Sequence, residues 1–157
     1  MWSIRSEHPD TTRAVGSVLG RLVVRRTVVA LVGDLGAGKT CFAQGVGMGM
    51  EVSGPVVSPT FILLAEYEGT IPLLHADAYR IKTHEVRSVG LEDILDDWEG
   101  VSLVEWADRF PQVLPSDYLL VRFHTPEPGT RELQISATGP THAALLHRLR
   151  TAWESSA

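Results

Sequence analysis

The chain has almost no cysteine, no excess of basic charge and no long apolar run. Cys41 is the only cysteine among 157 residues, which excludes an intramolecular disulfide and indicates a reducing compartment. Proteins that grip nucleic acid unaided carry a basic stripe, whereas this chain has a formal net charge of −5. No stretch approaches the roughly 18 apolar residues of a membrane span, and the N-terminal segment lacks the apolar centre of a signal peptide. We therefore expect a cytoplasmic protein that does not enter a membrane.

What the chain does contain is the composition of an ordinary globular protein. Hydrophobic residues make up 44% and charged residues 21%, so neither disorder nor a fibre is indicated. There is no internal repeat and no low-complexity tract. Because this length suits one compact unit with its own core, residues 1–157 are predicted to form a single domain.

Buried strands alternate with helical segments along the chain. Residues 27–33 and 101–106 are apolar runs typical of strands buried on both faces. Helices are expected in four segments: from Asp10 or Thr11 to about Leu22, 39–50, 82–98 with a break near Gly90, and 141–153. The second of these is expected to weaken toward its end, because Gly45, Gly47 and Gly49 are poor helix formers.

Two further segments resemble hairpins. Residues 60–79 are predicted to form two strands joined by a tight turn at Glu68–Gly69, and residues 118–137 form a second pair around "PEPG". The whole pattern predicts an α/β sandwich with a mostly parallel central sheet and antiparallel hairpin additions.

The segment "GDLGAGKT", residues 33–40, satisfies the pattern G-x-x-x-x-G-K-S/T between a buried strand and a helix. Glycines let the backbone N–H groups approach phosphate oxygens, and the start of the helix adds its positive dipole end. Lys39 is expected to reach the β- and γ-phosphates, and the Thr40 hydroxyl to ligate Mg²⁺. The motif therefore predicts a nucleotide site on a P-loop NTPase-like fold.

A P-loop site also requires an acidic residue at the end of a neighbouring strand. Glu105 directly ends one apolar run, and Asp77 lies two residues beyond "IPLLH"; spacing alone does not rank the two. His75 alternates with Asp77 and is expected to be a structural or hydrogen-bonding residue, because the other histidines show no zinc-ligand spacing. Trp106 is expected to pack in the core. Arg131 is either a solvated hairpin charge or a residue that faces the nucleotide.

Five segments occur in the order and spacing of the TsaE family, also called YjeE, which the chain resembles from residue 12 to residue 131. They are "GDLGAGKT", "VSPTF" (57–61), "HADAYR" (75–80), "VEW" (104–106) and Arg131. The resemblance implies a small P-loop ATPase that uses ATP and Mg²⁺ and is required for threonylcarbamoyladenosine modification of tRNA. It also implies that the protein docks on the TsaD–TsaB pair, which transfers the threonylcarbamoyl group, and that it contacts tRNA only indirectly through that complex.

The same resemblance implies a set of site residues. The phosphates would be held by the end of the loop, namely Gly36, Ala37, Gly38, Lys39, Thr40 and Cys41. Thr40 and Glu105 would surround Mg²⁺, and Asp77 would be a second acidic residue required, with Lys39 and Glu105, for hydrolysis.

Further residues are placed around the nucleotide by resemblance alone. Trp106 would lie beside the nucleotide or a partner surface, and Ser58 and Thr60 in a loop that senses the γ-phosphate. Pro9 and Arg131 would border the adenine.

The chain departs from the family pattern at Cys41, where the usual loop has a second threonine. A thiol is a poor hydrogen-bond donor to the α-phosphate, although the backbone N–H remains. Nucleotide binding is therefore expected to persist with reduced strength.

Two other functions are compatible with a P-loop. A small-metabolite kinase needs an arginine-bearing lid, whereas the arginines here are scattered along the chain at 80, 87, 109, 122 and 131. A nucleotide-gated binding module with little hydrolysis differs from the ATPase only in turnover.

Overall fold

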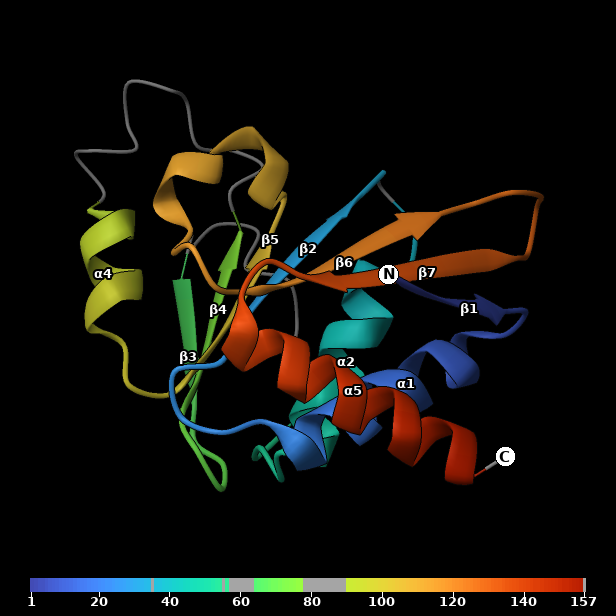
Figure 1. Ribbon diagram of the computed structural model, residues 1–157, viewed down its shortest axis with the longest axis horizontal. Helices are drawn as coiled ribbons and strands as arrows, with labels where there is room; N and C mark the ends of the chain where they lie inside the picture. The colour runs from blue at the N-terminus through green and yellow to red at the C-terminus, as the bar shows by residue number, and fades with distance from the viewer. Residues whose placement is uncertain (35, 55, 57–63, 78–89, 157) are drawn as a thin grey trace.

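The computed structural model describes residues 1–34, 36–54, 56, 64–77 and 90–156 (Figure 1). The chain order of the strands is β1 (Trp2–Ser6), β2 (Val28–Gly33), β3 (Leu64–Tyr67), β4 (Leu73–Asp77), β5 (Val101–Glu105), β6 (Leu119–His124) and β7 (Arg131–Ala137). The α-helices of the described part are α1 (Pro9–Leu22), α2 (Lys39–Gly49), α4 (Leu91–Asp97) and α5 (Pro140–Ser155). Two short 3₁₀ helices, η2 (Ala107–Arg109) and η3 (Pro111–Val113), follow β5.

The seven strands form one sheet in the order β1-β7-β6-β2-β5-β4-β3. The central strands β6, β2, β5 and β4 are parallel to one another, because β2 pairs in parallel with β5 and β6, and β4 pairs in parallel with β5. The flanking pairs β6–β7, β1–β7 and β3–β4 are antiparallel. The predicted α/β fold, with a mostly parallel centre and antiparallel hairpin additions, is confirmed.

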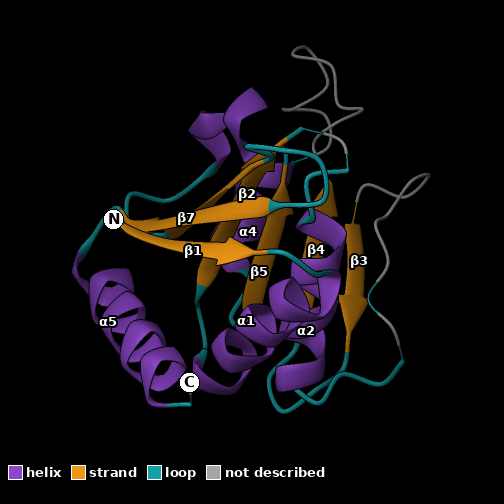
Figure 2. Ribbon diagram, turned by 90° about the vertical axis from the view of Figure 1, so that its right-hand side faces the viewer, coloured by secondary structure: helices purple, strands orange, loops and turns teal. Residues whose placement is uncertain are grey.

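Helices cover both faces of this sheet. Figure 2 shows α1, α2 and α5 on one side of the sheet, where Leu31, Leu103 and Val121 belong to a core shared with these helices. On the other side, Ala30, Val104 and neighbouring strand residues pack against α4, η2 and η3. The strand β2 lies between the two cores and is buried from Val28 to Val32, as expected for a β-branched run without alternation.

The glycines of α2 do not weaken its end, contrary to the sequence prediction. The helix runs unbroken to Gly49, and Gly45 and Gly49 are the surface on which α1 packs. A Cβ at Gly45 would lie 2.1 Å from the carbonyl oxygen of Arg13, and one at Gly49 would lie 2.2 Å from that of Ser17. On α1, a Cβ at Gly16 would likewise lie 2.4 Å from the Phe42 oxygen. The helix propensity lost at glycine is offset by this close approach of two backbones, which sequence periodicity does not show.

The amino-terminal end of the sheet is tied to α5 through a buried histidine. The His142 Nε2 accepts a hydrogen bond of 3.0 Å from the Val28 N–H, and its Nδ1 lies 2.8 Å from Oδ1 of Asp117. Asp117 also accepts hydrogen bonds from the backbone N–H groups of Thr141 and His142, at 2.9 and 3.1 Å. Because Nε2 accepts a hydrogen bond, Nδ1 carries the proton and donates a hydrogen bond to the carboxylate. Asp117 thus fixes the start of α5 and, through His142, the start of β2.

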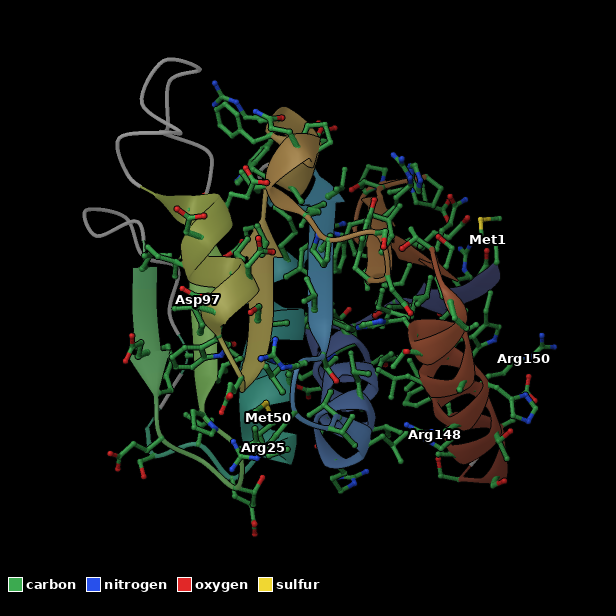
Figure 3. The ribbon with its side chains drawn as sticks, turned by 60° about the vertical axis from the view of Figure 1, so that its left-hand side comes forward. Met1, Arg25, Met50, Asp97, Arg148 and Arg150 are labelled. Atoms are coloured by element: carbon green, nitrogen blue, oxygen red, sulfur yellow. The ribbon has the colours of Figure 1, made fainter. Side chains whose placement is uncertain are left out.

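This region lies at the end of the molecule opposite the loop that follows β2. Figure 3 labels Arg25, in the turn before β2, and Met50, the C-cap of α2, and both lie at this end. Arg148 and Arg150, also labelled there, are exposed on α5.

Three local predictions differ from the structure. The first helix is capped by His8, whose Nδ1 accepts from the Asp10 N–H, because Pro9 at the first helical position moves the start upstream of Asp10. The tight turn at Glu68–Gly69 is instead a longer connection, residues 68–72, since Thr70 donates to the Met50 carbonyl at the end of α2. The edge strand β1 was not predicted, although Trp2 and Ile4 alternate with exposed residues.

The remaining predicted elements lie close to their expected bounds. The helix expected over 82–98 is described only from Leu91, after Gly90 with a φ of 68°; residues 82–89 lie outside the described part. Within the described ranges, no helix is both long and apolar enough to cross a lipid bilayer.

Candidate functional site

The loop between β2 and α2 has the backbone geometry that a phosphate-binding loop requires. Gly36 and Gly38 have φ angles of 77° and 105°, in the left-handed region that glycine adopts without strain. Gly38 is the N-cap of α2, and no side chain described here caps that end of the helix. A Cβ at Gly36 would meet no described atom within 4 Å. The start of α2 therefore presents its N–H groups and positive dipole end beside an open face of the loop.

Lys39 is held inside the loop by the chain itself. Its Nζ donates hydrogen bonds to the carbonyls of Gly33 and Asp34, the second at 2.8 Å, and lies 4.1 Å from the centroid of the Trp106 ring. Only 5% of Lys39 is exposed. Burial lowers the pKa of Lys39 below its usual value and outweighs the nearby carboxylates, of which Glu105 raises that pKa most.

Asp77 and Glu105 end two neighbouring parallel strands at the same edge of the sheet. They are register partners, as are His75 and Leu103 two positions earlier, so all four side chains lie on one face. Leu103 belongs to the core against α1 and α2, which identifies that face as the α2 side. Both carboxylates act electrostatically on Lys39. The structure thus brings together the loop and the two acidic residues that spacing could not rank.

Glu105 is joined to His75 beneath the site. The His75 Nε2 lies 2.6 Å from Glu105 Oε2, and the two side chains are 0% and 4% exposed. The other ring nitrogen of His75, Nδ1, is buried and has no hydrogen-bond partner in the described part of the chain. His75 is therefore a hydrogen-bonding residue, as the sequence predicted, but its partner was not predicted because the contact depends on strand register.

Trp106 follows Glu105 directly and lies between the core and the loop. Its indole packs partly buried against the core on the α4 side and also lies over the Lys39 ammonium. The residue has a φ of 59° and a ψ of 34°, an uncommon conformation for a bulky residue. Its backbone N–H donates a hydrogen bond of 3.0 Å to the Leu31 carbonyl. This backbone turn places the ring at the loop at the cost of local strain.

A cavity of about 190 Å³ lies on the other side of the loop. Its lining includes Pro9, Cys41 and Arg131 together with Gly36 and Gly38. The Arg131 guanidinium donates a hydrogen bond of 2.9 Å to the Gly36 carbonyl, so the second hairpin contacts the loop directly. Arg131 therefore contacts the loop, and its predicted place beside the nucleotide stays a prediction.

Other lining residues of this cavity were not predicted. Ser6, His8 and Thr12 contribute to it, and Ser6 and Thr12 share a buried hydrogen bond of 2.8 Å between their hydroxyls. They come to the loop because β1 pairs with β7. The only signal for them was the alternation of apolar residues over Trp2–Ser6.

The structure does not describe every expected site residue. Ala37 is buried in the loop, and Thr40 is exposed in the first turn of α2. Thr60 and Ser58 lie outside the described residues, so their predicted roles beside the nucleotide stay predictions.

Comparison with known proteins agrees with this arrangement over nearly the whole chain. The model of the family described as "Threonylcarbamoyl adenosine biosynthesis protein TsaE" matches residues 6–133. A protein of Nostoc sp. named tRNA threonylcarbamoyladenosine biosynthesis protein TsaE is 40% identical over 144 residues, which are 87% of this chain and 86% of the relative. The Bacillus subtilis protein of the same name is 34% identical over 92% of this chain and 91% of its own.

A solved structure shares the fold. The crystal structure of Bacillus subtilis YdiB superposes with a TM-score of 0.83 at 30% identity, covering 96% of this chain and 95% of that one. The family match runs from the last residue of β1 into β7 and includes the loop, both strand-end carboxylates and Arg131. The chain belongs to the TsaE family of threonylcarbamoyl adenosine biosynthesis proteins.

Proposed function

We propose that this chain is a Mg²⁺-dependent ATPase that serves threonylcarbamoyladenosine modification of tRNA in the cytoplasm, in association with the TsaD–TsaB pair. The observation that carries the proposal is the meeting of three elements at one edge of the sheet. The loop with Lys39 ends β2, and the paired carboxylates Asp77 and Glu105 end β4 and β5 on the face toward α2.

The loop fits a nucleotide triphosphate. Gly36 and Gly38 adopt left-handed backbone, and the start of α2 offers N–H groups to anionic oxygens. Lys39 makes its hydrogen bonds to loop carbonyls, which are weaker partners for an ammonium than phosphate oxygens. We therefore expect Lys39 to exchange these carbonyls for phosphate when nucleotide binds.

The acidic pair fits Mg²⁺ by its chemistry. A hydroxyl from Thr40 and carboxylates from Glu105 and Asp77 are hard oxygen donors of the kind that this ion prefers. When bound, the ion neutralises charge on the phosphates. Glu105 is buried and held by His75, whereas Asp77 is half-buried, so Glu105 suits a fixed ligand and Asp77 suits the orientation of water.

The cavity beside the loop supports a place for the base and sugar. Pro9, Cys41 and Arg131 line it together with Gly36 and Gly38 of the loop. We propose that the adenosine of ATP occupies this cavity and that Cys41 contacts the α-phosphate mainly through its backbone N–H.

Phosphate release measured for the chain alone and with the TsaD–TsaB pair tests the proposal. We expect slow turnover by the chain alone and at least about tenfold stimulation by the pair, because a partner can complete a site for phosphoryl transfer. The Lys39→Ala variant should lose at least about 100-fold in turnover, since it removes the only lysine ammonium of the loop motif.

Two results would contradict the ATPase. Nucleotide binding without any release of phosphate, even with the pair, would favour the nucleotide-gated binding module. Transfer of phosphate to a small molecule would favour the kinase.

A further inference from the structure

His75 is a polar residue in a place where the sheet is otherwise apolar. Its side chain is fully buried on β4, with Leu73 two residues earlier on the same strand and Leu103 opposite on β5. Both leucines belong to the core beneath α1 and α2. A leucine at position 75 would continue this core without burying a polar ring.

The hydrogen bonds of His75 do not explain its presence as a stabilising residue. Only Nε2 has a partner, Glu105 Oε2 at 2.6 Å, while Nδ1 is buried without a partner in the described residues. A buried ring with one unsatisfied nitrogen costs free energy that a single hydrogen bond offsets only in part. Half-satisfied polar groups of this kind are retained where they hold a neighbour in place.

The neighbour held here is Glu105. A carboxylate accepts hydrogen bonds only, so the proton of the short contact belongs to Nε2. This assignment leaves Nδ1 as a bare lone pair, which is the less costly atom to bury unpaired. The donated hydrogen bond fixes one oxygen of Glu105 and therefore the direction of the other, beside its register partner Asp77.

We propose that His75 is a positioning residue that holds the Glu105 carboxylate in the orientation in which it binds Mg²⁺. The proposal rests on the proposed function, because it concerns the same nucleotide site. Outer hydrogen bonds to metal ligands typically change metal affinity by about 10- to 100-fold when removed. The effect of His75 should therefore appear in the contribution of magnesium to nucleotide binding, and not in nucleotide binding as such.

The test measures the dissociation constant of the β,γ-imido analogue of ATP in EDTA and in MgCl₂. The ratio of the two constants is the magnesium coupling, and it requires no turnover. His75→Asn places its amide nitrogen near Nδ1 and is too short to reach Glu105, so the coupling should fall by about 10-fold or more. His75→Gln places an N–H₂ donor near Nε2 and should keep the coupling within about threefold.

His142→Gln is the matched control. His142 is also buried in this fold and also contacts a carboxylate, at 2.8 Å, but at the other end of β2. It should leave the magnesium coupling unchanged even where it lowers the melting temperature.

Three results would decide against the proposal. Equal coupling in His75→Asn and wild type overturns it, and so does an equal loss in His75→Asn and His75→Gln, which marks a purely structural residue. If wild-type protein binds no nucleotide, or binds it without any effect of magnesium, the proposed function itself is wrong. Comparison of variants with wild type therefore separates the two failures.

Discussion

Two buried histidine–carboxylate pairs occupy opposite ends of the same sheet, and they differ in how completely they are satisfied. At the amino-terminal end, His142 uses both ring nitrogens, one toward Asp117 and one toward the Val28 N–H. At the carboxyl end, His75 uses one nitrogen toward Glu105 and leaves the other without a described partner. The satisfied pair fits a role within the fold, whereas the half-satisfied pair fits the positioning role that we propose for His75.

The acidic partners differ in the same way. Asp117 receives two backbone N–H groups at the start of α5, so its lone pairs are used within the fold. Glu105 stands beside a second carboxylate, Asp77, next to a lysine ammonium. One carboxylate closes a helix end, and the other belongs to a cluster of charges at the phosphate loop.

The largest effect that would sharpen this comparison is expected from the carboxylates at the loop. Glu105→Gln and Asp77→Asn keep the shape of each side chain and remove its charge, so partner-stimulated phosphate release should fall by about 100-fold in each. The variant that also loses the magnesium coupling of nucleotide binding identifies the direct Mg²⁺ ligand. Asp117→Asn is the matched control and should retain full turnover, and retention of turnover in both site variants would contradict the assigned roles.

A smaller effect, on stability alone, is expected from His142→Leu. It leaves the Val28 N–H buried without its acceptor, which costs about 1–3 kcal/mol of unfolding free energy. For a domain of this size the melting temperature should fall by about 3–10 °C, as measured by thermal unfolding. Nucleotide affinity should be unchanged in the same variant, because His142 lies far from the loop. An unchanged melting temperature would show that the His142–Asp117 pair does not stabilise the fold.

The smallest effect concerns acid stability. Desolvation raises the pKa of Asp117, but the hydrogen bonds from Thr141 and His142 outweigh it and lower that pKa from 3.8 to about 2. Because the folded-state pKa is depressed, the stabilisation is present above pH 4 and is lost as the pH falls from about 4 to about 2. Urea unfolding at pH 5 and pH 3 should therefore show a smaller loss of stability for Asp117→Asn than for wild type.

The control for the acid experiment is Asp97→Asn, on the exposed end of α4 (Figure 3). It should follow the wild-type pH dependence. A wild-type slope in Asp117→Asn as well would show that other carboxylates dominate acid unfolding.

The parts of this structure that sequence predicts are those that depend on neighbours along the chain. The strand β2, the loop and the start of α2 follow from a motif whose glycines and lysine have one geometric use. The carboxylates at 77 and 105 follow from apolar runs that end in an acid. Their pairing could not be predicted, because it depends on the register between β4 and β5.

The contacts that sequence did not predict cross long distances in the chain. His75 meets Glu105 across two strands, and Arg131 meets Gly36 across the sheet. Gly45 and Gly49 of α2 were interpreted through helix propensity, although their role lies in the contact with α1. In each case the contacting atom belongs to a residue far away in the sequence, so local sequence patterns do not predict the contact.

The contact between α1 and α2 has a mechanical consequence for the loop. Backbone meets backbone where Gly16 and Gly49 face the opposite helix, with no side chain between them to act as a compressible spacer. Rotation or sliding of α2 would force carbonyl oxygens into the neighbouring helix. The helix α2, which begins with Lys39 and Thr40, is therefore fixed in position against α1. We expect a nucleotide bound at the loop to leave the position of this helix unchanged.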